Sequence, residues 1–218
     1  MKRSRKNTEI RTLIVVAKVV SMVFRPIYYP LLCTCILFTL TPLNLLPLGH
    51  KLIELAVMFI FTLALPSFLC IMYRRTRHIE YADMRRRTNR LVPYCIFIVC
   101  YMGYLYLMHQ ASVPYIQISV IIVALLIQIV CTILCVWWKV SVHAAGAGAI
   151  ISAVAVYGAV FQFNPLPWMS IAIILAGMVG TSRMLLRQHS LAQVLVGTFI
   201  GVCCGFYGII KGYLFFLI

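Results

Sequence analysis

Two short segments of the sequence combine a histidine with serines and a cation. The first holds Lys139, Ser141 and His143, and the second holds Ser182, Arg183 and His189. Histidine can act as a nucleophile or as a general acid or base near neutral pH. Arginine binds phosphate oxygens through two parallel N–H donors. Together these side chains suit the transfer of a phosphoryl group.

Acidic side chains are scarce, and this excludes several other chemistries. The 218 residues include nineteen Lys and Arg but only four Asp and Glu, so the formal net charge is +15. Hydrolysis by paired acids needs two positioned carboxylates, and Mg²⁺ or Ca²⁺ sites need oxygen ligands. Glu80 and Asp83 lie among arginines and are interpreted as their ion-pair partners. The nine cysteines lie in apolar runs without CxxC spacing, so we expect no metal and no cofactor.

The composition is that of a membrane protein. Apolar residues make up 63% of the chain, more than a soluble domain of this length can bury. A membrane-spanning helix needs about 20 predominantly apolar residues. By this measure the sequence predicts an all-α, polytopic transmembrane helical bundle of six to seven spans, folded as a single domain over residues 1–218. The seven predicted spans are 27–46, 52–73, 91–109, 115–138, 143–163, 166–186 and 190–210.

The first 25 residues are basic and are predicted to precede the bundle. Within them, residues 12–24 are apolar but interrupted by Lys18, and Arg25 follows directly. We expect this segment to form an interfacial helix against anionic headgroups, because such a pattern does not fit a cleavable signal peptide.

Charged and uncharged connections alternate along the predicted bundle, which indicates its topology. The almost uncharged connections lie near 47–51, 110–114 and 164–167, and the basic ones lie at 74–90, around 139 and at 183–187. Alternate connections share a membrane face, so these cations gather on the side of the basic N-terminus, with Lys51 and Lys211 opposite. The positive-inside rule makes that face cytoplasmic. Membrane orientation and anionic lipid explain the charge better than nucleic acid does.

Small residues recur every four positions on two of the predicted spans. The two stripes contain Ala144, Gly148 and Ser152, and then Gly197, Gly201 and Gly205. Small-xxx-small stripes allow helix backbones to approach closely in lipid. We therefore expect the fifth and seventh spans to pack against other helices through these faces.

Three segments resemble, in order, the three signature motifs of the type 2 phosphatidic acid phosphatase (PAP2) superfamily. The family patterns are K-x6-R-P, P-S-G-H and S-R-x5-H-x3-D. In this sequence the corresponding segments are 85–93, 139–143 and 182–193. The resemblance covers residues 85–201 and implies a PAP2/haloperoxidase-like helical core. Two predicted spans separate consecutive motifs, so all three return to one membrane face, where they can converge.

The resemblance also implies a role for each matching residue. His189 matches the histidine that attacks phosphorus and becomes a transient phosphohistidine. Arg183 matches the arginine that holds the phosphoryl oxygens, with Ser182 beside it. His143 matches the general acid that protonates the leaving alkoxide, and Ser141 matches a serine that hydrogen-bonds phosphate. Such a cationic set stabilises the transferring phosphoryl group without a metal.

The chain departs from the family pattern at several positions. Arg85 replaces the lysine of the first motif, Val92 replaces its arginine, and Arg90 is the nearest cation that can substitute. Lys139 precedes the second motif and is predicted to add a phosphate contact. Gln193 replaces the aspartate that orients the nucleophile, as in the glucose-6-phosphatase branch. An amide oxygen can accept the Nδ1–H bond, but it stabilises an imidazolium less than a carboxylate does.

Two functions follow from the residues and the resemblance. The first is a membrane-embedded, metal-independent phosphatase that hydrolyses a lipid phosphate or isoprenoid pyrophosphate through a phosphohistidine. The second is a non-catalytic or weakly active relative that binds or carries anionic lipid phosphates. In both cases we expect a multi-pass protein of a bacterial inner membrane whose partners are membrane lipids. The substrate, the membrane face of the site and the oligomeric state stay open at this point.

Overall fold

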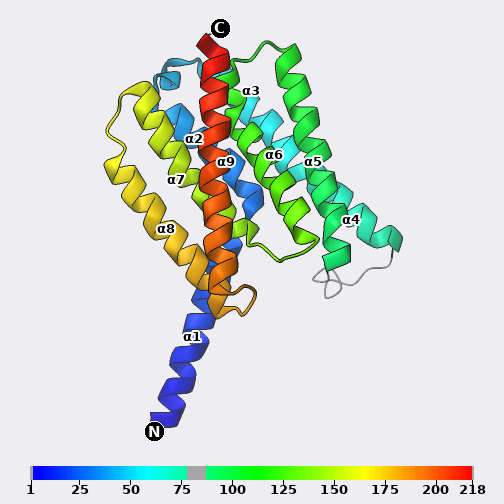
Figure 1. The fold of residues 1–218 in the computed structure, drawn as a ribbon, viewed down its shortest axis with the longest axis vertical. Helices are drawn as coiled ribbons and strands as arrows, with labels where there is room; N and C mark the ends of the chain where they lie inside the picture. The colour runs from blue at the N-terminus through cyan, green and yellow to red at the C-terminus, as the bar shows by residue number, and fades with distance from the viewer. Residues whose placement is uncertain (1, 78–86, 218) are drawn as a thin grey trace.

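The computed structural model describes residues 2–77 and 87–217, and within them the side chains of 11–77 and 91–214. All regular elements in this part of the chain are helices, arranged side by side as a bundle (Figure 1). They are α1 (Lys2–Val23), η1 (Pro26–Tyr28), α2 (Tyr29–Leu40), η2 (Pro42–Leu45), α3 (Leu48–Phe59), η3 (Ile60–Ala64), α4 (Leu65–Arg77), α5 (Arg87–Gln110), α6 (Tyr115–Cys135), α7 (Val142–Phe161), α8 (Leu166–Leu185) and α9 (Leu191–Leu217).

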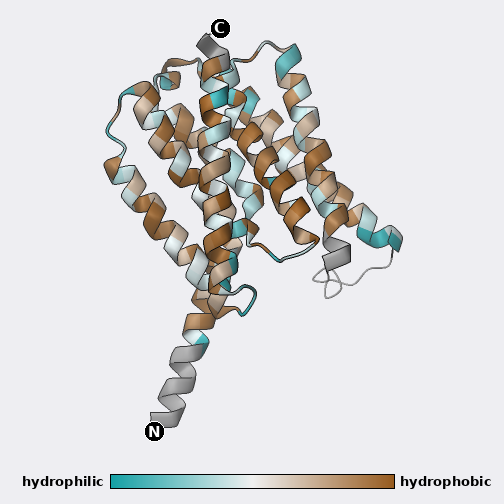
Figure 2. Ribbon diagram, in the orientation of Figure 1, coloured by the Kyte–Doolittle hydropathy of each residue, from teal (hydrophilic) through white to brown (hydrophobic). Residues whose placement is uncertain are grey.

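Seven segments of the described chain are long and apolar enough to cross a membrane. They are Arg11–Leu40, Leu48–Arg77, Leu91–Gln110, Tyr115–Cys135, Val142–Phe161, Leu166–Leu185 and Leu191–Leu214. Apolar residues cover much of the sides of the bundle, and hydrophilic residues concentrate toward its ends (Figure 2). The predicted all-α class and the predicted count of seven spans are both confirmed.

The first span differs from the predicted boundaries of 27–46. Its helix α2 has only 12 residues, which is about 18 Å of rise and less than the hydrocarbon thickness of about 30 Å. After α2 the backbone is extended at Thr41, and Pro42 starts the 3₁₀ helix η2. The candidate span therefore reaches back over η1 into α1, to Arg11, where the described side chains begin. Pro26 and Pro42 start the 3₁₀ helices on either side of α2, because proline lacks the N–H that would continue a helix.

Helices α7 and α9 form the most extensive packing pair, and their glycines explain the close approach. A Cβ atom added at Gly201 would overlap the backbone carbonyl of Ala145, and one at Gly148 would overlap that of Thr198. Backbone therefore touches backbone at both points. The predicted packing role of the two small-residue stripes is confirmed.

The described parts of the segments that carry the predicted motifs all lie at one end of the bundle. In Figure 1 the start of α5, the α6–α7 connection and the α8–α9 connection all lie at the lower end, near the point where α1 joins. The ends of α2 and α9 and the start of α3 lie at the opposite end. The described parts of the three segments therefore lie at the same end of the bundle, as the even number of spans between them predicts.

Candidate active site

The turn between α8 and α9 fixes the spacing between Arg183 and His189. After α8 the backbone of Arg187 is left-handed, with φ of 51°. The Gln188 N–H bonds the Arg183 carbonyl at 3.1 Å, and the Arg187 N–H bonds the Met184 carbonyl at 2.9 Å. This pair of bonds is a Schellman motif, which ends a helix and reverses the chain. The five residues between arginine and histidine are therefore one compact turn.

Gln193 holds the His189 ring and also caps α9. Its side-chain oxygen Oε1 lies 3.2 Å from Nδ1 of His189 and accepts a bond from the Ser190 N–H at 3.2 Å. The Ser190 hydroxyl accepts the Gln193 N–H at 3.4 Å. The reciprocal Ser190–Gln193 bonds form a capping box at the start of the helix. Glutamine thus occupies the orienting position with a geometry fixed by the helix end.

His143 lies in the first turn of α7, next to the α8–α9 turn. Ser141 is the N-cap of α7, and its hydroxyl accepts the Ala144 N–H at 3.4 Å. The Ser141 N–H in turn bonds the carbonyl of Gln193 at 3.3 Å. Arg183 and His189 lie within electrostatic range of the His143 ring. The second and third motifs are therefore joined by a backbone hydrogen bond, and their basic side chains lie close together.

Lys139 makes a second link between the same two connections. Its ammonium group donates to the backbone carbonyl of Gln188 at 2.6 Å. The bond fixes the α6–α7 connection against the turn that carries His189. The contact of Lys139 with phosphate that the sequence predicts stays a prediction.

Helix α1 contributes to the site, which the sequence interpretation did not foresee. The Arg183 guanidinium donates through Nη1 to the buried hydroxyl of Ser21 at 2.5 Å. The backbone of Ser21 also lies within hydrogen-bonding reach of the His143 ring, and Arg25 interacts with that ring electrostatically. The end of α1 thus holds Arg183 and adds positive charge.

The spacing of residues in α1 could have indicated this role from the sequence. Ser21 and Met22 follow Lys18 by three and four residues, and Arg25 follows Met22 and Ser21 by three and four. All four line the same cavity. This is the spacing of one helical face. A face that places a hydroxyl between two cations indicates an anion-binding surface as well as a headgroup anchor.

The two histidines and Arg183 face one cavity of about 640 Å³, within the usual range of about 300–1,000 Å³ for ligand pockets. None of the described residues that line it is acidic, and several are cationic. Its polar and charged lining residues are Lys18, Ser21, Arg25, Tyr94, Tyr101, Gln128, His143, Arg183, Gln188 and His189. A cavity with this lining attracts anions and offers them several hydrogen-bond donors.

Two further predicted site residues, Ser141 and Ser182, are described by the structure and two, Arg85 and the side chain of Arg90, are not. Ser141 and Ser182 are buried, and the Ser182 hydroxyl donates to the carbonyl of Val179 at 2.7 Å. Neither serine lines the cavity. Arg85 lies outside the described residues. Arg90 belongs to α5, four residues before the cavity-lining Tyr94, but its side chain lies outside the described part.

No group of three or more His, Cys, Asp or Glu close enough to hold a metal ion occurs among the described residues. The site as described therefore consists of histidine, arginine and amide groups. These groups can position a phosphoryl group, attack it and move a proton.

Comparisons with known proteins agree with this geometry. Residues 137–213 match the family model of the PAP2 superfamily, a range that contains His143, Arg183, His189 and Gln193. No curated protein and no solved structure matches the chain significantly. Phosphatase activity is the usual property of this family, and the seven apolar helices support an integral membrane protein. The match over residues 137–213 supports membership of the PAP2 superfamily.

Proposed function

We propose that this protein is a metal-independent phosphatase that hydrolyses a lipid phosphate or isoprenoid pyrophosphate in a membrane. The observation that carries the proposal is the meeting of His189, His143 and Arg183 at one cationic cavity at the end of an apolar bundle. A phosphate headgroup fits the charge of the cavity, and a lipid tail fits its surroundings. We further propose a bacterial inner membrane as the location.

His189 is the nucleophile in the proposed reaction. Gln193 Oε1 accepts the Nδ1–H bond, so the neutral ring carries its lone pair on Nε2. Nε2 attacks phosphorus, the bond from phosphorus to the leaving oxygen breaks, and phosphohistidine forms. Water then attacks phosphorus, the P–N bond breaks, and inorganic phosphate leaves.

In the proposed reaction His143 protonates the leaving group and Arg183 binds the phosphoryl oxygens. Protonated His143 gives its proton to the departing alkoxide or phosphate and later accepts one from the attacking water. Arg183 stabilises the equatorial oxygens through its guanidinium, which the Ser21 hydroxyl holds in place.

The experiment that tests the proposal is a phosphate-release assay on the purified protein in EDTA. Phosphatidic acid, phosphatidylglycerol phosphate, undecaprenyl pyrophosphate and a lipid A phosphate are offered separately. Release from at least one of them at an undiminished rate in EDTA is expected, because the proposed steps need no metal. A complete loss of release in EDTA that added metal restores would overturn the metal-independent mechanism.

The alternative is a relative that binds lipid phosphate and turns it over weakly or not at all. It is favoured by Gln193, since an amide stabilises an imidazolium less than the aspartate of the family pattern. Gln193→Asp in the same assay separates the two. A large gain in turnover would indicate a weakened site, and an unchanged rate would indicate an intact variant of the site. Binding of anionic lipid by the wild type without turnover of any substrate would establish the alternative.

A further inference from the structure

A second, apolar cavity lies inside the bundle next to the cationic cavity. The two share four lining residues, Pro26, Tyr101, Gln128 and Val142. Because the same side chains line both cavities, the two spaces adjoin at these residues. We refer to this second cavity as the slot.

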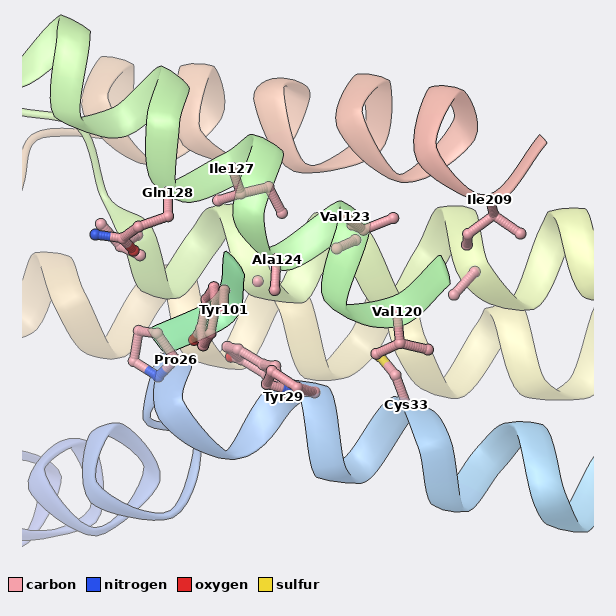
Figure 3. A pocket seen from close by; sticks show the side chains of 15 residues that line it. Pro26, Tyr29, Cys33, Tyr101, Val120, Val123, Ala124, Ile127, Gln128 and Ile209 are labelled. Carbon is pink, nitrogen blue, oxygen red and sulfur yellow. The ribbon is translucent and has the colours of Figure 1, made fainter. Parts of the chain in front are cut away.

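The slot is long and thin. On α7 its lining runs from Val142 to Ala153, which is twelve residues and about 16 Å of helix rise. Figure 3 shows Gln128 and Pro26 at one end and Ile209 at the other. Its volume is only about 50 Å³, a few times the roughly 10–15 Å³ needed for one water. Such a shape suits a linear group of small cross-section.

The slot lies inside the bundle and not on its lipid-facing surface. Residues of η1, α2, α5, α6, α7 and α9 line it. Most of them are buried, including Cys33, Val120 and Ile209. Beyond the shared end the lining is apolar except for the hydroxyl of Tyr29 and the thiol of Cys33. The small side chains of Ala124, Ala149 and Ala153 leave the space open. Water gains few hydrogen bonds there, and a hydrocarbon chain loses none.

We propose that the slot receives the hydrocarbon chain of a single-chain lipid phosphate whose headgroup occupies the cationic cavity. The inference rests on the proposed function and narrows its substrate class. Isoprenyl phosphates and single-acyl lipid phosphates share the required chemistry, namely one linear apolar chain that ends in phosphate. A lipid with two acyl chains fits less well, because the slot is too narrow for both.

The first test locates the chain without any turnover. Purified protein is photolabelled with a non-hydrolysable alkyl phosphonate that carries a diazirine at the end of its chain. Labelled residues in the slot, such as Val120 or Ile209, are the expected result. Labelling restricted to exposed positions such as Ile174 of α8 or Phe68 of α4 would overturn the proposal, whether or not the protein is a phosphatase.

The second test measures chain-length selectivity. Wild-type kcat/KM for n-alkyl phosphates is expected to rise by roughly fourfold for each methylene buried in the slot. Ala153→Leu fills the inner end and should lower kcat/KM for the longest chains by about tenfold, with the shortest unchanged within about twofold. Ala124→Leu fills the middle of the slot and should also lower kcat/KM for the longest chains. Ala56→Leu makes the same change at an exposed position of α3 and should have no effect.

Three substrates then distinguish the possible sources of the chain. Farnesyl phosphate, lysophosphatidic acid and diacyl phosphatidic acid are compared in wild type and Ala153→Leu. Higher kcat/KM for one or both single-chain lipids, reduced by the substitution, supports the proposal. Equal kcat/KM for the diacyl lipid, or a chain-length profile that Ala153→Leu leaves unchanged, would overturn it while the phosphatase assignment stood.

Discussion

Replacement of His189 by alanine is expected to lower phosphate release from a lipid phosphate by about four orders of magnitude or more. The imidazole is the group that would form the bond to phosphorus, and no other described side chain takes its place in the turn after α8. Alanine also removes the partner of Gln193 Oε1 but leaves the capping box with Ser190 intact. The helix end should therefore persist, so the loss is chemical. The rate is measured in detergent with EDTA.

A matched control is His109→Ala, which removes an exposed imidazole from the last turn of α5. That ring contacts Tyr115 and lies at the other end of the bundle. Its loss should leave turnover within about twofold, as expected for a surface substitution. Full activity in His189→Ala would remove the proposed nucleophile and with it the mechanism.

The second large effect is expected for Arg183→Ala. Loss of one preorganised donor to developing charge typically costs about 10²–10³ in kcat, and KM should rise because the same guanidinium binds the ground-state phosphate. Arg183→Lys keeps the charge but loses the planar fork, so it should recover only part of the rate. Steady-state kinetics on one lipid phosphate separates the effects on kcat and KM.

Arg75→Ala is the control for charge alone, because Arg75 is an exposed arginine at the end of α4. It should change neither constant appreciably. An Arg183→Ala protein with wild-type kcat would show that the arginine at the cavity serves membrane orientation only.

The sequence predicts the spans and their packing because these depend on local chemistry. Apolar length alone determines how many helices cross the membrane, and residue size determines where α7 and α9 can touch. The positions Gly148 and Gly201 are identifiable from their four-residue spacing, and the structure places backbone against each. The convergence of the motifs follows from counting spans, which needs no three-dimensional information.

Side-chain partners are harder to predict because they come from distant parts of the chain. Ser21 and Arg183 are 162 residues apart, and only the packing of α1 on α8 brings them together. Ser182 follows the family pattern but uses its hydroxyl within its own helix, as serine often does. The slot likewise depends on residues from six elements, among them Cys33 of α2 and Ile209 of α9. The periodicity of a single helix carries no information on which distant side chains it will contact.

The central claim is that His189 carries the phosphoryl group during turnover. Wild-type protein is mixed with a lipid phosphate radiolabelled in its terminal phosphate and quenched within the first turnover in alkaline detergent, which preserves phosphohistidine. The expected result is acid-labile label on the peptide that contains His189 in the wild-type protein, and no label on that peptide in the His189→Ala variant. Protein that releases product yet carries no label, or label on a different residue, would contradict it.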